Sequence, residues 1–285
     1  MSTPFSLRAA ARLFAIVLAC IVSLSLAGCA VGHGATSASA SELQTRLAAW
    51  LPADVLLLGE QHDAPQHQAL EQQIVEALAA RGVLAAVALE MADSGDNTAT
   101  LKPDASEEQT RIALRWNNDA WPWATYGPGV MSAVRAEVPV LGANLPRAQM
   151  RSNMADAALD QRLPAPALKA QQQLIRQGHC GLLPESQITP MTRIQIAKDI
   201  HMADTVQAAV RPGQVVVLIT GSVHADKQLG VPQHLPPELR VKAIRLRSGT
   251  AAAGGERESF DGVWLTSATP DKDYCADLAK QLPRH

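Results

Sequence analysis

The stretch Val55-Leu-Leu-Leu-Gly-Glu-Gln-His-Asp63 decides how this chain folds. Its four apolar residues run into Gly59, and a continuous apolar run that ends at glycine is typical of a strand buried on both faces. The acidic side chain of Glu60 and the imidazole of His62 follow at once. They therefore lie at the carboxyl end of the strand, where open α/β sheets place their ligand sites.

A second stretch repeats this pattern late in the chain. Val215-Val-Val-Leu-Ile-Thr-Gly-Ser-Val-His-Ala-Asp226 is another apolar run with Gly-x-x-His spacing, and His224 takes the place of His62. If the two strands are parallel neighbours, both imidazoles reach one edge of the sheet, and we expect a shared polar site there. A strand-end histidine is, however, more often a structural hydrogen-bonding group. Asp63 has an alternative role as the N-cap of a helix that starts near Pro65.

The rest of the chain predicts an α/β fold with a mainly parallel sheet, helices on both faces and a helical insertion between the third and fourth strands. Glu90 ends the second strand and should reach the same edge as Glu60. Pro128 is expected to open a helix, with Tyr126 just ahead of it. Further strands are predicted at residues 83–91, 138–141, 241–246 and 263–266, and helices at 65–81, 106–116, 129–137 and 191–210, with breaks at Pro164, Pro166, Gly178, Pro184 and Pro190.

The first 28 residues have the features of a signal peptide, with a basic start followed by an apolar segment too short for a confident membrane span. The segment ends in Leu26-Ala27-Gly28-Cys29, which resembles the cleavage box of bacterial lipoproteins. We expect Cys29 to carry the lipid, residues 29–44 to form a tether and residues 45–285 to form one domain. Because Ala30 follows the cysteine, the expected location is the periplasmic side of the outer membrane. The alternative is a membrane span that happens to end in cysteine.

Charge and cysteine content narrow the possible partners. The net charge is −2 and no basic run occurs, which argues against nucleic-acid binding. The expected membrane contact is the lipid alone. After processing, Cys180 and Cys275 remain in an oxidising compartment, which predicts a disulfide, with two free buried thiols as the alternative. No Cys-x-x-Cys-His motif occurs, so covalent c-type haem attachment is excluded.

Aromatic residues gather between Trp116 and Tyr126, where four of the eight aromatic residues that follow Cys29 lie within eleven positions. Such a cluster can be part of the core or of an interface, because aromatic side chains bury large areas. The alternative is a platform, formed by Trp121 and Trp123, for a flat apolar ligand, with the phenol of Tyr126 as its polar group.

Taken in order, the motifs of this chain resemble the ChaN family of haem-binding, iron-regulated lipoproteins, within the Tiki/TraB and erythromycin-esterase-like superfamily of paired Gly-x-x-His motifs. The resemblance covers about residues 45–270. It rests on Leu58-Gly-Glu-Gln-His-Asp63, Glu90-Met91, Trp121-Pro-Trp-Ala-Thr-Tyr-Gly-Pro128, Leu141-Gly-Ala-Asn-Leu-Pro-Arg147, Gly178-His-Cys-Gly181, residues 195–203 and Gly221-Ser-Val-His224.

The resemblance implies non-covalent haem with a tyrosine as axial ligand, and paired haems in a homodimer. Of the two tyrosines, Tyr126 matches the family's Trp-Pro…Tyr-x-Pro motif and takes the ligand role, while Tyr274 matches no motif. A phenolate suits ferric haem iron. Arg147 and His179 could support the phenolate or pair with haem propionates. The expected partners in iron acquisition are an outer-membrane haem receptor or a periplasmic haem carrier.

The superfamily also contains hydrolases, and this supplies an alternative function. Glu60, His62, Glu90 and His224 would then bind a divalent metal ion or share acid–base work on a water molecule. Their dispersal over more than 160 residues is unlike a local metal motif. A third possibility is that the four side chains only hydrogen-bond one another. We expect a haem-binding protein rather than an enzyme.

Overall fold

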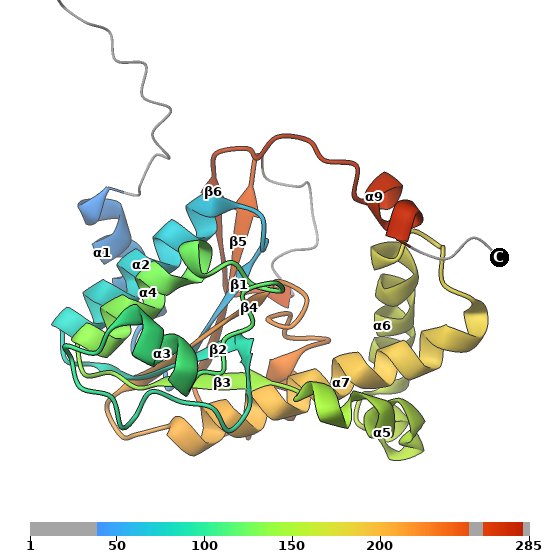
Figure 1. Cartoon of the computed structure of the whole chain (residues 1–285), viewed down its shortest axis with the longest axis horizontal. Helices are drawn as coiled ribbons and strands as arrows, with labels where there is room; N and C mark the ends of the chain where they lie inside the picture. The colour runs from blue at the N-terminus through green and yellow to red at the C-terminus, as the bar shows by residue number, and fades with distance from the viewer. Residues whose placement is uncertain (1–38, 251–258, 282–285) are drawn as a thin grey trace, which may run out of the picture. The chain divides into compact units, whose positions relative to one another are not determined.

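A six-stranded parallel sheet forms the centre of the computed structural model, which describes residues 39–250 and 259–281 (Figure 1). The strand order is β3-β2-β4-β1-β5-β6, and every neighbouring pair is parallel. The strands are β1 (Val55–Glu60), β2 (Leu84–Asp93), β3 (Val140–Asn144), β4 (Val215–Gly221), β5 (Val241–Ser248) and β6 (Gly262–Thr266). The predicted α/β class is confirmed.

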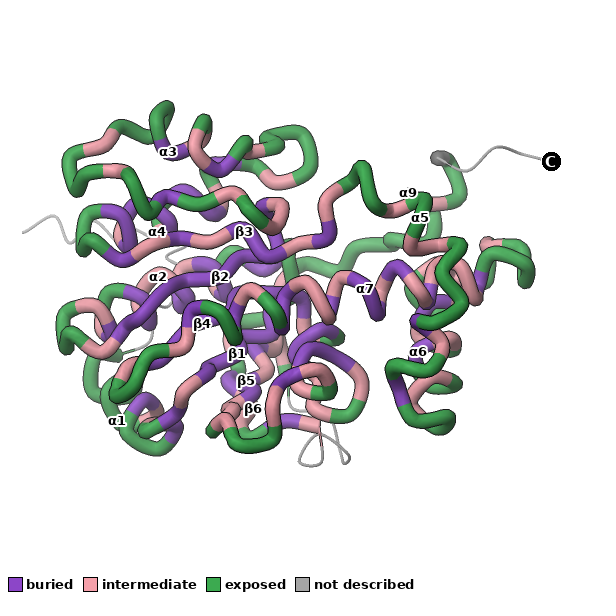
Figure 2. The backbone as a smooth tube through the Cα atoms, turned by 90° about the horizontal axis from the view of Figure 1, so that it is seen from below, coloured by how far each residue is buried: buried purple, intermediate pink, exposed green. Residues whose placement is uncertain are grey.

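The two Gly-x-x-His strands are neighbours at the centre of this sheet. β1 pairs with β4 in parallel, and Glu60 stands opposite Gly221 in the register. Alternate side chains of β1 enter different cores: Leu56 and Leu58 join the core on one face, while Val55 and Leu57 join the core on the other. Both faces are covered, as the continuous apolar run predicts, and the sheet is the most buried part of the chain (Figure 2).

Helices cover both faces of the sheet. Buried residues of α1, α2 and α4 belong to one core, and those of the second half of α7 belong to the other. The segment from α5 to α7 lies between β3 and β4 in the chain and is the predicted helical insertion. The helices are α1 (Ala40–Trp50), α2 (Pro65–Ala80), α3 (Glu107–Ala113), α4 (Trp123–Arg135), α5 (Met150–Ala155), α6 (Ala165–Gly178), α7 (Glu185–Ala209) and α9 (Tyr274–Gln281), with 3₁₀ turns at Arg147–Gln149, Ala157–Gln161 and Val231–His234.

The connections after β1 and β4 leave the sheet toward opposite faces. The chain after β1 enters α2, whose Leu70 and Ile74 pack into the first core. The chain after β4 places Ala225 and Val231 in the second core. Such divergence at the carboxyl ends of adjacent strands opens a crevice, which is where doubly wound sheets bind ligands.

Two helix predictions need correction. α4 begins at Trp123 and contains both Tyr126 and Pro128, so Tyr126 is not ahead of a helix opened by Pro128. Asn118 Oδ1 accepts a hydrogen bond from the Trp123 amide at 2.9 Å and starts the helix early. Similarly, α7 runs through Pro190, because buried residues before and after the proline continue on one packed face, and that packing outweighs the lost hydrogen bond.

The role of Asp63 as a helix cap is also wrong. The N-cap position of α2 is Ala64, which makes no side-chain cap, and Pro65 follows it. The Asp63 carboxylate instead accepts hydrogen bonds from the Gln61 amide and the Tyr274 hydroxyl. Its carboxylate therefore serves one local contact, with Gln61, and one distant contact, with Tyr274.

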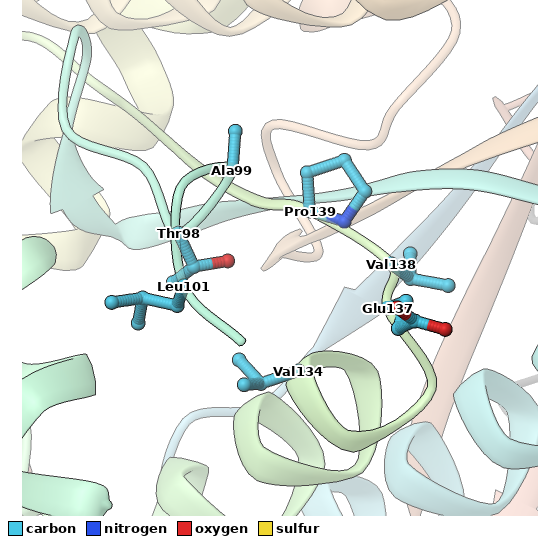
Figure 3. Close-up of a pocket in the computed structure, with 7 residues that line it drawn as sticks. All are labelled: Thr98, Ala99, Leu101, Val134, Glu137, Val138 and Pro139. Atoms are coloured by element: carbon cyan, nitrogen blue, oxygen red, sulfur yellow. The ribbon is translucent and has the colours of Figure 1, made fainter. Parts of the chain in front are cut away.

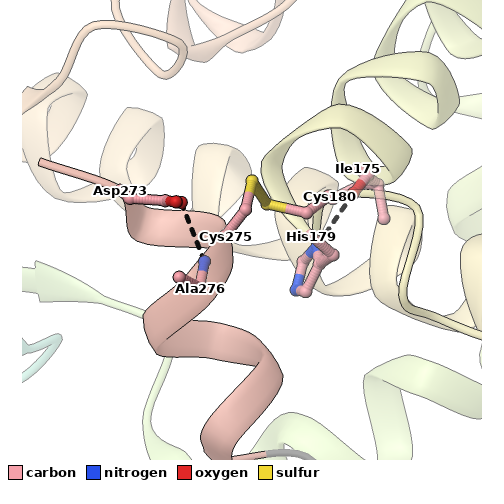
Figure 4. Close-up of a disulfide and its surroundings, with 6 residues drawn as sticks. All are labelled: Ile175, His179, Cys180, Asp273, Cys275 and Ala276. Atoms are coloured by element: carbon pink, nitrogen blue, oxygen red, sulfur yellow. Dashed lines mark hydrogen bonds between the residues drawn. A yellow bond between two sulfur atoms is a disulfide. The ribbon is translucent and has the colours of Figure 1, made fainter.

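The two ends of the chain are described in part. The predicted signal peptide, Cys29 and residues 30–38 lie outside the described residues, and α1 begins at Ala40, inside the segment expected to be a tether. Among the described helices, none combines the length and hydrophobicity needed to cross a bilayer. Cys180 and Cys275 form the predicted disulfide, which joins α9 to the turn between α6 and α7 (Figure 4).

Candidate functional site

The carboxylate of Glu60, at the end of β1, is buried and accepts hydrogen bonds from three side chains. Its Oε1 accepts from His62 Nδ1 at 2.6 Å and from the Tyr126 hydroxyl at 2.8 Å, and its Oε2 accepts from the Gln68 amide. Glu60 is only 1% exposed. These donors come from the loop after β1, from α4 and from α2, so the first Gly-x-x-His motif is tied to both helices on that face.

The buried carboxylate of Glu90, in β2, is the point where the second motif meets the first. Its Oε2 accepts hydrogen bonds at 2.8 Å from the Thr220 hydroxyl and the Gly221 amide. Its Oε1 lies 3.4 Å from His224 Nε2 and 3.7 Å from Lys198 Nζ. Because His62 Nε2 is 3.9 Å from Oε2, both imidazoles converge on this one carboxylate.

The glycines of the two motifs allow the strand ends to approach each other. A Cβ atom at Gly221 would lie 3.0 Å from His62 Nε2 and 3.6 Å from a Glu90 oxygen. A Cβ atom at Gly59 would lie 2.9 Å from Ala225 Cβ and 3.0 Å from Ser222 Cα. A side chain at Gly221 would therefore displace His62 next to Glu90, and one at Gly59 would push away the chain that follows β4.

The second imidazole has its own carboxylate partner on α7. His224 Nδ1 donates to Asp199 Oδ1 at 2.5 Å, and the Gln195 amide lies 3.0 Å from both ring nitrogens. Asp199 is fully buried, and burial raises the pKa of its carboxyl above the usual value. The pair repeats the arrangement of His62 with Glu60, so the crevice holds two carboxylate–imidazole pairs.

Charges in the site stabilise one another. Burial opposes ionisation of Glu90, but His224, His62 and Lys198 together outweigh burial and hold the pKa of the Glu90 carboxyl well below its usual range. Burial disfavours the His224 cation too, yet the Glu90 and Asp199 carboxylates outweigh it and raise the imidazole pKa. Burial lowers the pKa of His62, but the hydrogen bond to Glu60 and the charges of Glu90 and Glu60 together outweigh burial and raise it. The site therefore holds a Glu90 carboxylate against a His224 imidazolium at neutral pH.

Two groups that pack behind Glu60, Glu71 on α2 and Tyr126 on α4, retain their protons. Burial, followed by the charge of Glu60, raises the pKa of the fully buried Glu71 carboxyl well above its usual range. Burial and the same neighbour raise the pKa of the Tyr126 phenol above its usual value. Tyr126 is 6% exposed. The structure thus holds both groups in their neutral forms behind Glu60.

The two imidazoles open on a pocket of about 540 Å³ at the carboxyl ends of β1 and β4, within the usual range for small-molecule sites. Its floor contains Glu60, Glu90 and His224, and its wall includes Val223 and Tyr274. The Trp121 ring, half-buried, lies edge-on to the His62 ring at 4.9 Å between centroids. The aromatic segment therefore borders this pocket.

A smaller cavity of about 230 Å³ lies away from this site, near the amino end of β3 (Figure 3). Backbone and apolar side chains line most of it, with Thr98 and Glu137 as the polar members. Thr98 Oγ1 accepts a hydrogen bond from the Val140 amide at 2.9 Å, a structural role for the hydroxyl. The carboxyl-end pocket is accordingly the stronger candidate for function.

Several predicted site residues lie outside the lining of the carboxyl-end pocket. Trp123 is buried in the core and its indole nitrogen donates to Glu107 at 2.8 Å. Arg147 is exposed in the turn after β3. His179 flanks the disulfide, where its Nδ1 donates to the Ile175 carbonyl at 2.8 Å (Figure 4). By contrast, the pocket and its floor gather all four residues of the Gly-x-x-His prediction: Glu60, His62, Glu90 and His224.

Other site residues were missed by sequence reasoning. Gln195, Lys198 and Asp199 have i, i+3, i+4 spacing on α7, so one helix face carries all three toward the sheet end. This row of polar residues on one helix face, beside rows of apolar residues, could have predicted that Gln195, Lys198 and Asp199 belong to the site. Glu71 and Tyr274 carried no comparable signal, because only the tertiary fold brings them to β1.

The structure does not support the divalent-metal alternative. Among residues 39–250 and 259–281, no group of three or more His, Cys, Asp or Glu side chains is arranged to hold a metal ion. The reason is local: Glu60 accepts hydrogen bonds at both oxygens, Glu90 accepts two at Oε2 and pairs its Oε1 with His224 and Lys198, and both Nδ1 atoms donate to carboxylates.

Comparisons with known proteins identify relatives of this arrangement. A family profile described as "Haem-binding uptake, Tiki superfamily, ChaN" matches residues 46–235. The solved structure "Cofacial heme binding to ChaN of Campylobacter jejuni" is 25% identical, aligns with 79% of this chain and 92% of its own, and has a TM-score of 0.65. No curated protein sequence matches significantly.

Two further structures align more loosely. A type III effector, HopBA1, shares 14% identity over 83% of this chain and 98% of its own, with a TM-score of 0.45. An erythromycin esterase in its open conformation shares 13% identity over 73% of each chain, with a TM-score of 0.46.

Because the buried Glu71 carboxyl is neutral, the effect of Glu71→Gln on the free energy of unfolding should depend on pH. Glu71 keeps its proton in the folded state and loses it on unfolding above pH ~4.3, so its contribution to the free energy of unfolding falls as pH rises. The glutamine variant cannot ionise and therefore removes this loss. In urea unfolding, it should gain on the order of 1 kcal/mol or more over the wild type between pH 4.5 and pH 8. Glu76→Gln, an exposed change on α2, is the control, and an equal difference at both pH values for Glu71→Gln would contradict the neutral carboxyl.

Proposed function

Because the chain belongs to the ChaN family of haem-binding uptake proteins in the Tiki superfamily, we propose that it binds haem non-covalently for iron uptake. The observation that carries this proposal is the family match over residues 46–235, which include the whole aromatic segment and both Gly-x-x-His motifs. The Campylobacter jejuni relative, described by its cofacial haem binding, adds support at 25% identity.

The rim of the carboxyl-end pocket fits a flat apolar ring better than its floor does. Val223 and Tyr274 are 38% and 49% exposed on the wall, and Trp121 borders His62. The floor carries ionised carboxylate, which would repel haem propionates. We therefore place the porphyrin at the rim. Arg147 and His179 remain candidates to pair with propionates that extend beyond the pocket.

In this proposal Tyr126 would supply the axial ligand, which requires its buried hydroxyl, outside the pocket lining, to become accessible at the rim. Haem supplies an iron atom that accepts a phenolate oxygen. For that role the Tyr126 hydroxyl must exchange its 2.8 Å hydrogen bond with Glu60 for the iron and lose its proton. Glu60, which accepts this hydrogen bond, is placed to receive the proton. Two chains with their rims face to face would pair two haems, and the cofacial haem binding of the Campylobacter protein supports this arrangement.

The proposal includes a lipid anchor at the outer membrane. It is supported by Leu26-Ala27-Gly28-Cys29 and the short apolar segment before it. An anchored chain at the periplasmic side would receive haem from an outer-membrane receptor or pass it to a periplasmic carrier.

A second candidate function is metal-independent acid–base chemistry, such as hydrolysis. The specific observation is the pair of contacts at 2.6 and 2.5 Å that give His62 and His224 each a carboxylate partner beside one pocket. Glu60 holds His62 Nδ1, so Nε2 faces the pocket side and can take a proton from water. His224, held protonated by its carboxylates, can stabilise developing negative charge.

Haem titration of the protein without its lipid should give a Soret band that saturates at one haem per chain, with the mass doubling in sedimentation. Tyr126→Phe should lose or reshape the Soret and charge-transfer bands, because the phenolate ligand is gone. Tyr274→Phe tests the second phenol, and Gln68→Ala removes another donor of Glu60 without removing a phenol. If only Tyr274→Phe alters the bands, Tyr274 is the ligand instead of Tyr126. If neither variant alters the bands, no tyrosine is the axial ligand.

The lipid anchor predicts that Cys29 becomes acylated. Cells fed a labelled fatty acid should label the wild-type protein, and Cys29→Ala should abolish the label and release the protein from the membrane fraction. Cys20→Ala, within the signal segment, is the matched control and should be labelled as the wild type is. Labelling of Cys29→Ala would contradict the assignment.

Acid–base chemistry predicts slow hydrolysis of an activated ester, such as p-nitrophenyl acetate, in the presence of a chelator. The rate should rise as pH rises through the raised pKa of His62, because only neutral imidazole acts as a base. His62→Ala should reduce the rate by ~10²-fold. His201→Ala, which removes an imidazole bonded to Ser94, is the control. Equal rates in the two variants would remove this candidate.

A further inference from the structure

The C-terminal segment of the chain reaches back to the pocket. Tyr274, the first residue of α9, lines the pocket together with Glu60, His62 and His224. Its hydroxyl donates to the Asp63 carboxylate, in the loop after β1. Its ring also lies 5.0 Å from the Lys272 ammonium. The wall of the pocket is thus completed by a residue more than 200 positions away in the chain, outside the family match at residues 46–235.

A covalent bond fixes this segment beside the pocket. Cys275, next to Tyr274, is joined to Cys180 in the turn that follows α6, with 5.6 Å between the Cα atoms (Figure 4). Helix α9 itself is exposed or half-exposed along residues 274–280, so burial holds it only weakly. The hydrogen bond to Asp63 and the disulfide therefore hold Tyr274 from two sides.

We propose that Tyr274 is a ligand-contact residue of the pocket and that the Cys180–Cys275 disulfide positions it, so that affinity for the ligand depends on a bond made outside the pocket. Tyr274 and Val223 are the large exposed apolar side chains of the lining, and a flat ligand at the rim would cover both. The identity of that ligand as haem rests on the function proposed above. The positioning itself rests on the contacts of Tyr274 and Cys275.

Haemin titration tests the contribution to affinity. Tyr274→Ala should weaken binding about fivefold or more, the loss expected when one aromatic contact is removed. Cys180→Ser combined with Cys275→Ser should weaken binding in the same direction while leaving the phenol present. Leu265→Ala, which removes a comparably exposed apolar side chain outside the pocket lining, is the control and should bind as the wild type does. Wild-type affinity in Tyr274→Ala would overturn the proposal.

A second measurement needs no haem. Diethyl pyrocarbonate modifies accessible neutral imidazoles, and mass spectrometry of the peptides gives a rate for each histidine. His62 should react at least about twofold faster in Tyr274→Ala and in the double serine variant, because the wall beside it opens more often. His67, fully buried in α2, is the internal reference, and a rise at His67 would reveal general unfolding.

The two measurements separate the possible failures. If the wild type does not bind haemin but His62 reacts faster in the variants, the haem proposal fails and the positioning role stands. If the wild type binds haemin and His62 reacts equally in all variants, the positioning role fails and the haem proposal stands. Should the double serine variant fail to fold, Tyr274→Ala and Asp63→Asn test the same wall with the disulfide intact.

Discussion

A negative charge buried at the end of β2 constrains the rest of this structure. A carboxylate withdrawn from water loses several kcal/mol of hydration unless other groups replace it. Glu90 is compensated by the His224 imidazolium, the Lys198 ammonium and two hydrogen bonds from β4. These groups come from the neighbouring strand and from the helix that crosses one face of the sheet. The strand order and the position of α7 are therefore coupled to the charge balance of the site.

The pocket above this charge combines two chemical environments. Its floor is a set of fixed, hydrogen-bonded ionic groups, which suits proton transfer. Its rim is aromatic and aliphatic, which suits a flat ring. The segment from Trp116 to Tyr126 serves both, because the Trp121 ring contacts His62 at the rim while the Tyr126 hydroxyl donates to Glu60 below it. The proposed haem site and the proposed acid–base site therefore overlap at Glu60, which accepts hydrogen bonds from both Tyr126 and His62.

Much of the fold could be predicted because local patterns and the tertiary structure agree. The two apolar runs ending in Gly59 and Gly221 predicted two buried strands of a mainly parallel sheet, and the structure pairs them side by side in parallel. Predictions failed where a distant contact outweighed a local preference. Asp63 suits a helix cap, but Gln61 and Tyr274 occupy its carboxylate. Pro128 suits a helix start, but the packing of Tyr126 and the Asn118 bond extend α4 backwards.

The site residues on or just after the strands could be predicted from the sequence, but most of those on the helices were not. Glu60, His62, Glu90 and His224 each follow or end a strand, so the parallel sheet alone brings them together. Asp199, Glu71 and Tyr274 depend on how helices pack on that sheet, and one sequence does not specify this packing. The Trp-rich segment was predicted to be either a core or interface cluster or a ligand platform; in the structure Trp123 lies in the core, and the half-buried Trp121 contacts His62.

The position of β4 has a consequence for how the chain is made. β4 lies between β1 and β2, although it follows them by more than 120 residues in sequence. When β1, α2 and β2 have been synthesised, β4 has not. The edges of β1 and β2 that will pair with β4 therefore remain without hydrogen-bond partners until β4 follows. Such long-range closure is slow and leaves apolar strand edges open to intermolecular pairing. Holding chaperones that cover unpaired strand edges should therefore matter more for this fold than for one built from consecutive neighbours.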